Sequence, residues 1–232
     1  MAAFAISFFA CHKSYTSEPI PDPDTGLPTT PETKPQYNNT SFGVYKGVVV
    51  GSTGTIVFRI NNGDNLVKGY LTIDDVKDTL STTQTLVPGQ PILDALFTGR
   101  ISSMTLSVHA DGSNASLSNI SIVGHDNVAI VIIHENSDAQ VFCYEGTYTG
   151  YYSGILNCTR VGANSVADTA YVVAKLNDTL MLQGFGAVIN NNVNITLAPA
   201  FQIFGSFSGD NFNGRWTGPG VDTGAYVCIR TF

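Results

Sequence analysis

The residues of this sequence that are best suited to bind a ligand are aromatic with one exception, an arginine, and they lie in two short segments. This candidate set comprises Tyr144, Tyr148, Tyr151, Tyr152, Arg215 and Trp216. Residues four apart on a β-strand point to the same face, so Tyr144 and Tyr148 would face the same way. Exposed aromatic rings stack on sugar rings while polar neighbours supply hydrogen bonds. The pattern predicts a glycan-binding surface; the alternative is that these rings are core or cross-strand pairs.

Two glutamates are candidates for acid-base chemistry. Glu135 and Glu145 are the only glutamates after residue 41, and hydrolysis of a glycosidic bond requires two carboxyl groups about 5 to 10 Å apart. The candidate partners are Asp94, Asp126 and Asp138. Glu135 precedes Asn-Ser-Asp, which is typical of a solvated turn. A small hydrolase that uses Glu135 or Glu145 is therefore an alternative function rather than the leading one.

Metal, cofactor and nucleic-acid functions find little support in the sequence. Zinc sites need closely spaced cysteines and histidines, whereas His109, His125 and His134 fall on separate predicted strands. We therefore expect no metal and no cofactor. The eleven Lys and Arg residues are scattered, and the formal net charge is −7. Because phosphate backbones require clustered cations, this composition argues against nucleic acid as a partner.

Three cysteines, Cys143, Cys158 and Cys228, follow Cys11. In an oxidising compartment, one disulfide and one buried thiol would account for this odd number. Cys143 and Cys158 flank a Gly- and Tyr-rich segment that could form a hairpin, so they are the first candidate pair. Cys158 with Cys228 is the second, if their strands are neighbours. The third interpretation is three buried free thiols that pack as small apolar side chains.

The elements that carry these side chains are predicted to be β-strands. The chain has 43% hydrophobic and 12% charged residues with 23 glycines, a mixture typical of sheets joined by tight turns. From about residue 41, short runs rich in Val, Ile, Thr, Tyr and Phe recur, and in one of them Ile56, Phe58 and Ile60 share a face. The turn dipeptides between such runs are Asn62-Gly63, Asp111-Gly112 and Asn213-Gly214.

We therefore predict an all-β, antiparallel body, barrel-like or a sandwich, over residues 41–232. The continuously apolar run 128–133 predicts a central strand that is buried on both faces or packed between layers. A weak internal echo relates residues 43–47 (GVYKG) to 146–150 (GTYTG), and 141–144 (VFCY) to 226–229 (YVCI). A duplication would give halves of 41–145 and 146–232; chance recurrence in a Gly-rich sequence is the alternative.

The N-terminus carries a separate signal. Residues 1–10 are apolar but too few to span a bilayer, which needs about 20, and small Ala10 precedes Cys11, as in an export signal. The ending Phe8-Phe9-Ala10-Cys11 resembles the lipobox of bacterial lipoproteins, in the form found in Bacteroidota. The resemblance implies that residues 1–10 are a cleaved signal peptide and that lipidated Cys11 is the first mature residue.

Residues 11–40 would then form a tether between the lipid and the body. Residues 18–37 hold six of the ten prolines, which favours an extended, semi-rigid polyproline conformation. The resemblance implies an exported protein anchored to the cell envelope, at the outer membrane. Acidic residues, which direct such lipoproteins to the cell surface, are missing from residues 12–15 (HKSY). Both a periplasmic and a surface-facing orientation therefore remain as alternatives.

Together these features predict a non-catalytic envelope lipoprotein that binds or scaffolds, with a membrane anchor and a glycan or an envelope protein as partner. The alternatives are the hydrolase and lipocalin-like carriage of an apolar ligand. A flat exposed aromatic platform would favour glycan binding, a cleft with two facing acids would favour hydrolysis, and an enclosed apolar cavity would favour carriage.

Overall fold

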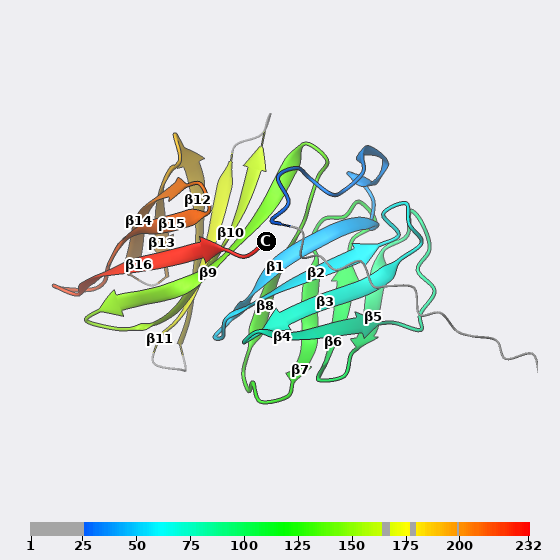
Figure 1. Cartoon of the computed structure of the whole chain (residues 1–232), viewed down its shortest axis with the longest axis horizontal. Coiled ribbons are helices and arrows are strands. Elements are labelled where there is room, and N and C mark those ends of the chain that lie inside the picture. Colours follow the sequence, from blue (N-terminus) through cyan, green and yellow to red (C-terminus); the bar gives the residue numbers. More distant parts are fainter. Residues whose placement is uncertain (1–25, 164–167, 177–179, 199) are drawn as a thin grey trace, which may run out of the picture.

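The computed structural model describes residues 26–163, 168–176, 180–198 and 200–232, and β-strands dominate it (Figure 1). The first sheet contains β1 (Gly43–Val50), β2 (Gly54–Ile60), β3 (Val67–Ile73), β4 (Val76–Ser81), β5 (Ile92–Thr98), β6 (Ser102–Val108), β7 (Ser116–Ile122) and β8 (Ala129–His134). A closed barrel follows, with β9 (Ala139–Gly150), β10 (Gly154–Ala163), β11 (Thr169–Leu176), β12 (Leu180–Ile189), β13 (Asn192–Leu197), β14 (Phe201–Ser208), β15 (Asn211–Thr217) and β16 (Thr223–Arg230). The prediction of an antiparallel all-β body is confirmed.

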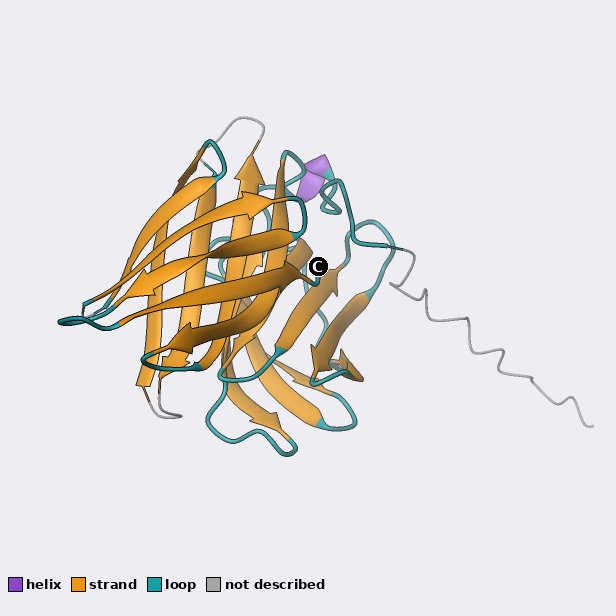
Figure 2. Cartoon of the chain, turned by 60° about the vertical axis from the view of Figure 1, so that its left-hand side comes forward, coloured by secondary structure: helices purple, strands orange, loops and turns teal. Residues whose placement is uncertain are grey.

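One short 3-10 helix, η1 (Pro35–Tyr37), precedes the strands and is purple in Figure 2. The predicted signal peptide, Cys11 and the first part of the predicted tether lie outside the described residues. No helix in the described part of the chain is long and apolar enough to cross a membrane.

Both sheets are meanders in which strands pair mainly with their neighbours in sequence. The order of the first sheet is β7-β6-β5-β4-β3-β2-β1-β8, so the chain returns at β8 to pair with β1. In the barrel, β9 to β16 follow one another and β16 pairs with β9. Closure removes free strand edges from the barrel, whereas β7 and β8 are the two edges of the first sheet.

The division between the two sheets lies between His134 and Ala139, a few residues before the predicted division after residue 145. The echo of residues 43–47 and 146–150 falls on β1 and β9, the first strand of each sheet. The second echo falls on β9 and β16, which pair within the barrel. The first echo therefore relates the two sheets, and the second does not.

Residues 129–133 of the apolar run lie in β8. This is an edge strand, so the predicted central position is wrong, whereas the alternative, packing between layers, is confirmed. Ile130 and Ile132 face the core of the first sheet. Val131 faces the other way and packs with Val48 and Val173 in a small cluster between the two sheets. Because the barrel covers the second face of β8, an edge strand can be apolar on both faces.

The interior of the barrel is filled by rings that lie against glycines of the wall. The Tyr226 hydroxyl lies against Gly205 and Gly214, and the indole of Trp216 lies against Gly224. A side chain at any of these glycines would overlap the ring. A cavity inside the barrel, lined by Tyr148, Leu156 and Trp216 among others, has a volume of about 20 Å³, which is room for about one water molecule.

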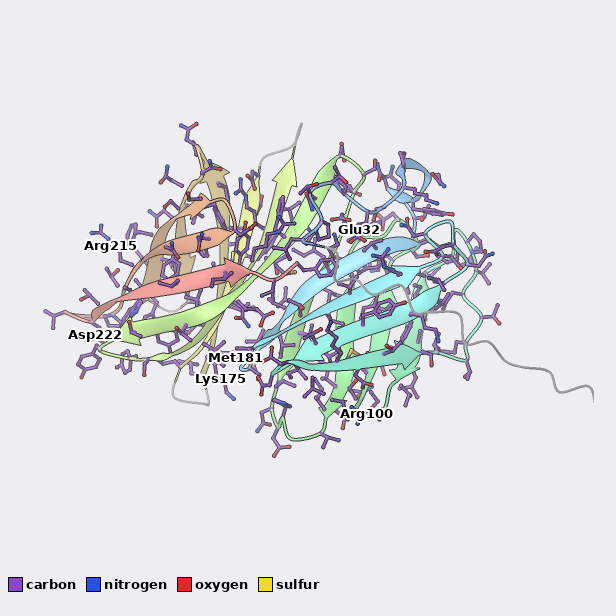
Figure 3. All side chains as sticks on the ribbon, viewed as in Figure 1. Glu32, Arg100, Lys175, Met181, Arg215 and Asp222 are labelled. Carbon is purple, nitrogen blue, oxygen red and sulfur yellow. The ribbon has the colours of Figure 1, made fainter. Side chains whose placement is uncertain are left out.

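Residues 26–42, which we call the strap, cross the junction between the two sheets, where Figure 3 labels Glu32. The Gln140 amide and the Arg230 guanidinium donate hydrogen bonds to the Pro28 carbonyl. The Asn62 amide donates to the Glu32 carbonyl over 2.8 Å. The last part of the predicted tether is therefore packed against the body.

Candidate functional site

Three of the predicted glycan-binding rings line the barrel interior. Tyr144, Tyr148 and Trp216 are 2%, 6% and 3% exposed, and the Trp216 indole donates a hydrogen bond to the Thr149 carbonyl over 3.0 Å. Tyr144 and Tyr148 do share a face, but it is the inner one. The predicted platform is wrong for these three rings, because the closed barrel uses them to fill its core.

Tyr151 and Tyr152 lie at one end of the barrel, in the turn between β9 and β10. Tyr151 is exposed, and its ring meets that of Tyr152 nearly at right angles, at 80° and 4.8 Å between centroids. Tyr152 also packs on Trp216 at 6.1 Å. Arg215 points outward and covers the Phe204 ring at 5.1 Å, since it alternates with inward Trp216. These residues do not form a flat platform, and Arg215 is separated from them by the wall.

Glu135 is a structural residue rather than a candidate catalyst. Its side chain is fully buried and accepts hydrogen bonds from Lys46 Nζ at 2.7 Å, from the Val141 amide at 2.9 Å and from the Glu32 amide at 2.6 Å. Glu32 also pairs with Lys46 at 2.9 Å. The predicted solvated turn and the catalytic role of Glu135 are both wrong, because this carboxylate joins the strap to both sheets.

Glu145 lies in a polar cleft of about 560 Å³, which Asp74, Asp75 and Lys77 also line. The pKa of the Glu145 carboxyl is raised, mainly by burial and further by the charges of Asp75 and Asp74. A hydrogen bond from Thr231 Oγ1 at 2.8 Å lowers the pKa but does not cancel this rise. The expected partners Asp94, Asp126 and Asp138 are not among the residues that line the cleft. The acidic neighbours of Glu145 are therefore Asp74 and Asp75 rather than the expected residues.

The three described cysteines are buried free thiols. Cys143 faces the small cluster between the sheets, whereas Cys158 and Cys228 face the barrel core. The pairing of Cys143 with Cys158 is wrong, because the two lie on opposite faces of the wall. The pairing of Cys158 with Cys228 is not formed either, and the Cys228 thiol instead donates to the Leu156 carbonyl. Burial raises the pKa of Cys143 and of Cys228 to about 12.

A groove runs along the junction of β8 with the outer wall of the barrel, and we call it the junction groove. It consists of two depressions of about 510 and 520 Å³ that share Val131 and Tyr171 in their walls. The polar depression is lined by Asn39, Asp111, Ser113, Asn114, His134 and Asn136, among others. The aromatic depression includes Tyr171, Gln183, Phe185 and Thr196. Its size is typical of small-ligand sites.

The aromatic depression presents a ring pair on the outside of the barrel. Tyr171 and Phe185 are directly opposite each other on β11 and β12, with ring centroids 5.9 Å apart and planes 32° apart. Phe185 is 70% exposed. Its neighbours Gly184 and Gly186 face the other way, toward Ile195 in the barrel core. No pattern in the sequence pointed to this pair, because exposure of Phe185 depends on which face of the strand lies outside the barrel.

The polar depression offers free hydrogen-bonding groups. Asn136 Oδ1 is buried without a hydrogen-bond partner among the described residues, and a buried polar atom of this kind gains by accepting a donor. Asp111 Oδ1 accepts from the Ser113 hydroxyl at 2.7 Å and amide at 3.0 Å. These bonds hold the pKa of Asp111 below its usual range. The groove therefore places acceptors for hydroxyl groups beside an aromatic surface.

His134 forms the inner wall of the polar depression. Its Nε2 lies 3.1 Å from the Phe42 carbonyl, to which it can only donate, and its ring stacks on Tyr45 at 4.6 Å. Burial lowers the pKa of His134 to about 4. The imidazole is therefore neutral near pH 7.

Comparison of the chain with protein-family models, with curated proteins and with solved structures finds no match.

Proposed function

We propose that this chain is a non-catalytic glycan-binding protein of the bacterial cell envelope, anchored by a lipid on Cys11, and that the junction groove is its binding site. The observation that supports it is the exposed Phe185 ring, paired with the half-buried Tyr171, beside a depression lined by exposed amides and the exposed Asp111 carboxylate. Sugars combine apolar ring faces with hydroxyl groups, so they match both parts of the groove.

A glycan array probed with the full chain carrying Cys11→Ser tests this proposal. Phe185→Ala is expected to weaken binding about tenfold, which corresponds to about 1.4 kcal/mol. Ile189→Ala is the matched control, because Ile189 lies on the same strand, is 68% exposed and is not among the groove residues. Absence of binding to every glycan, or equal binding by wild type and Phe185→Ala, would refute the proposal.

A second candidate function, hydrolysis at Glu145, is favoured by the raised pKa of this carboxyl beside Asp75 in an open cleft. A carboxyl with a raised pKa beside a second carboxyl is an arrangement that glycoside hydrolysis uses. Release of reducing sugar from glycans bound on the array, abolished by Glu145→Gln and unaffected by Phe185→Ala, would favour it over simple binding. Carriage of an apolar ligand is not favoured, since the barrel cavity found has room for about one water.

A further inference from the structure

The charges around the junction groove limit which glycans it can accept. Among the described residues that line its two depressions, none is Lys or Arg, and the ionisable ones are Asp111, His134 and Tyr171. Sites for carboxylate, sulfate or phosphate groups are built from Arg or Lys, which pair with the anion directly. This groove offers an anion no such partner.

The one carboxylate in the groove carries its charge and has room for a ligand. Asp111 is exposed, and both hydrogen bonds from Ser113 end on Oδ1. Oδ2 accepts no hydrogen bond from the described residues and is free for a ligand hydroxyl. An anionic sugar at the same place would meet a like charge, which lowers affinity.

The imidazole in the wall does not compensate for this charge. His134 is held by its contacts with the Phe42 carbonyl and the Tyr45 ring, and it is neutral near pH 7. The remaining polar groups are uncharged amides and hydroxyls, of Asn39, Asn114, Asn136 and others. Such groups both donate and accept, as sugar hydroxyls do.

We infer that the junction groove selects uncharged glycans and discriminates against glycans that carry carboxylate or sulfate groups. This inference rests on the proposed function and adds the chemical class of the ligand. Asp111 contributes to selection by repulsion, while the exposed amides of Asn39 and Asn114 and the ring pair contribute the attraction.

The test measures binding of the full chain carrying Cys11→Ser to two sets of immobilised probes at 0.15 M salt and pH 7.5. The neutral set contains gluco-, manno-, xylo- and chito-oligosaccharides, and the anionic set contains oligogalacturonate, hyaluronan and chondroitin sulfate. Binding to at least one neutral probe, about tenfold or more tighter than to every anionic probe, is expected.

Two variants separate a local effect from overall charge. Asp111→Asn keeps an acceptor for Ser113 but removes the charge, so the discrimination against anionic probes is expected to fall several-fold. Asp126→Asn makes the same change in net charge at an exposed position outside the groove lining and is expected to leave the discrimination unchanged. Anionic probes bound as tightly as neutral ones would overturn the inference and leave the proposed function standing. Binding to neither set would overturn both.

Discussion

Acidification is expected to destabilise the protein through His134. In the folded state, burial lowers its pKa from the usual 6.5 to about 4, with the imidazole stacked on Tyr45 and bonded to the Phe42 carbonyl. In the unfolded chain the imidazole regains its ordinary pKa. The unfolded state therefore binds more protons between pH 6.5 and 4, and stability falls as the pH falls through this range.

The magnitude follows from the two pKa values. A full separation from 6.5 to about 4 corresponds to about 3 kcal/mol. About 2 kcal/mol of this is lost between pH 8 and pH 5, because at pH 5 the unfolded histidine is protonated and the folded one is mostly neutral. Glu145 acts in the opposite direction. Because its pKa is raised in the folded state, the folded protein takes up this proton before the unfolded chain does, and acidification stabilises the fold.

Urea unfolding at pH 8, 7, 6 and 5 measures this loss. His134→Gln removes the titration and is expected to flatten the profile, although the variant starts less stable at pH 8. His109→Gln replaces an exposed histidine and is expected to keep the slope of the wild type. The contribution of Glu145 is common to all three proteins, so their difference isolates His134. Equal slopes in the wild type and His134→Gln would show that the reasoning is wrong.

Three further predictions concern the packing of the fold. Lys46→Met leaves the buried carboxylate of Glu135 without its cation and is expected to cost about 3 to 5 kcal/mol in urea unfolding; a change below about 1 kcal/mol would contradict a structural role for the pair. Gly205→Ala places a methyl group on the Tyr226 hydroxyl and is expected to lower the melting temperature. Partial recovery is expected in the double variant with Tyr226→Phe, which removes an oxygen that has no hydrogen-bond partner among the described residues. In the Cys11→Ser chain, the three remaining thiols are expected to react with an aromatic disulfide reagent only after unfolding. Prompt reaction of the native protein would contradict their burial.

The strands and most of the turns could be predicted because their signals are local. Alternation gave the shared face of Ile56 and Phe58, and Asn62-Gly63 does join β2 to β3. Asn213-Gly214 has the same turn signature but lies inside β15, where Gly214 makes space for the Tyr226 hydroxyl. A turn and a packing role both require glycine, so the dipeptide alone could not distinguish them.

The binding surface was harder to predict, because periodicity shows that two rings share a face but not which face is inside. Tyr144 and Phe185 both lie on alternating strands, yet the first is core and the second is exposed. The difference depends on closure of the barrel. Closure requires the first barrel strand, β9, to pair with the last, β16, and a contact between segments so far apart in the chain leaves no local signal. The groove also combines residues from both sheets, since Asp111 follows a strand of the first sheet and Phe185 lies in the barrel. Sequence patterns within either part could not show that the two meet.

The paired rings and glycines inside the barrel also bear on how this wall could be redesigned. Each ring occupies volume that the backbone leaves free at a glycine, so trimming Trp216 or Tyr226 to alanine would hollow the interior without a change in strand register. Each such change costs about 3 to 5 kcal/mol, and a ligand that fills the void would return part of that stability. A few substitutions of core rings would therefore convert this filled barrel into one with a cavity that can bind small apolar molecules.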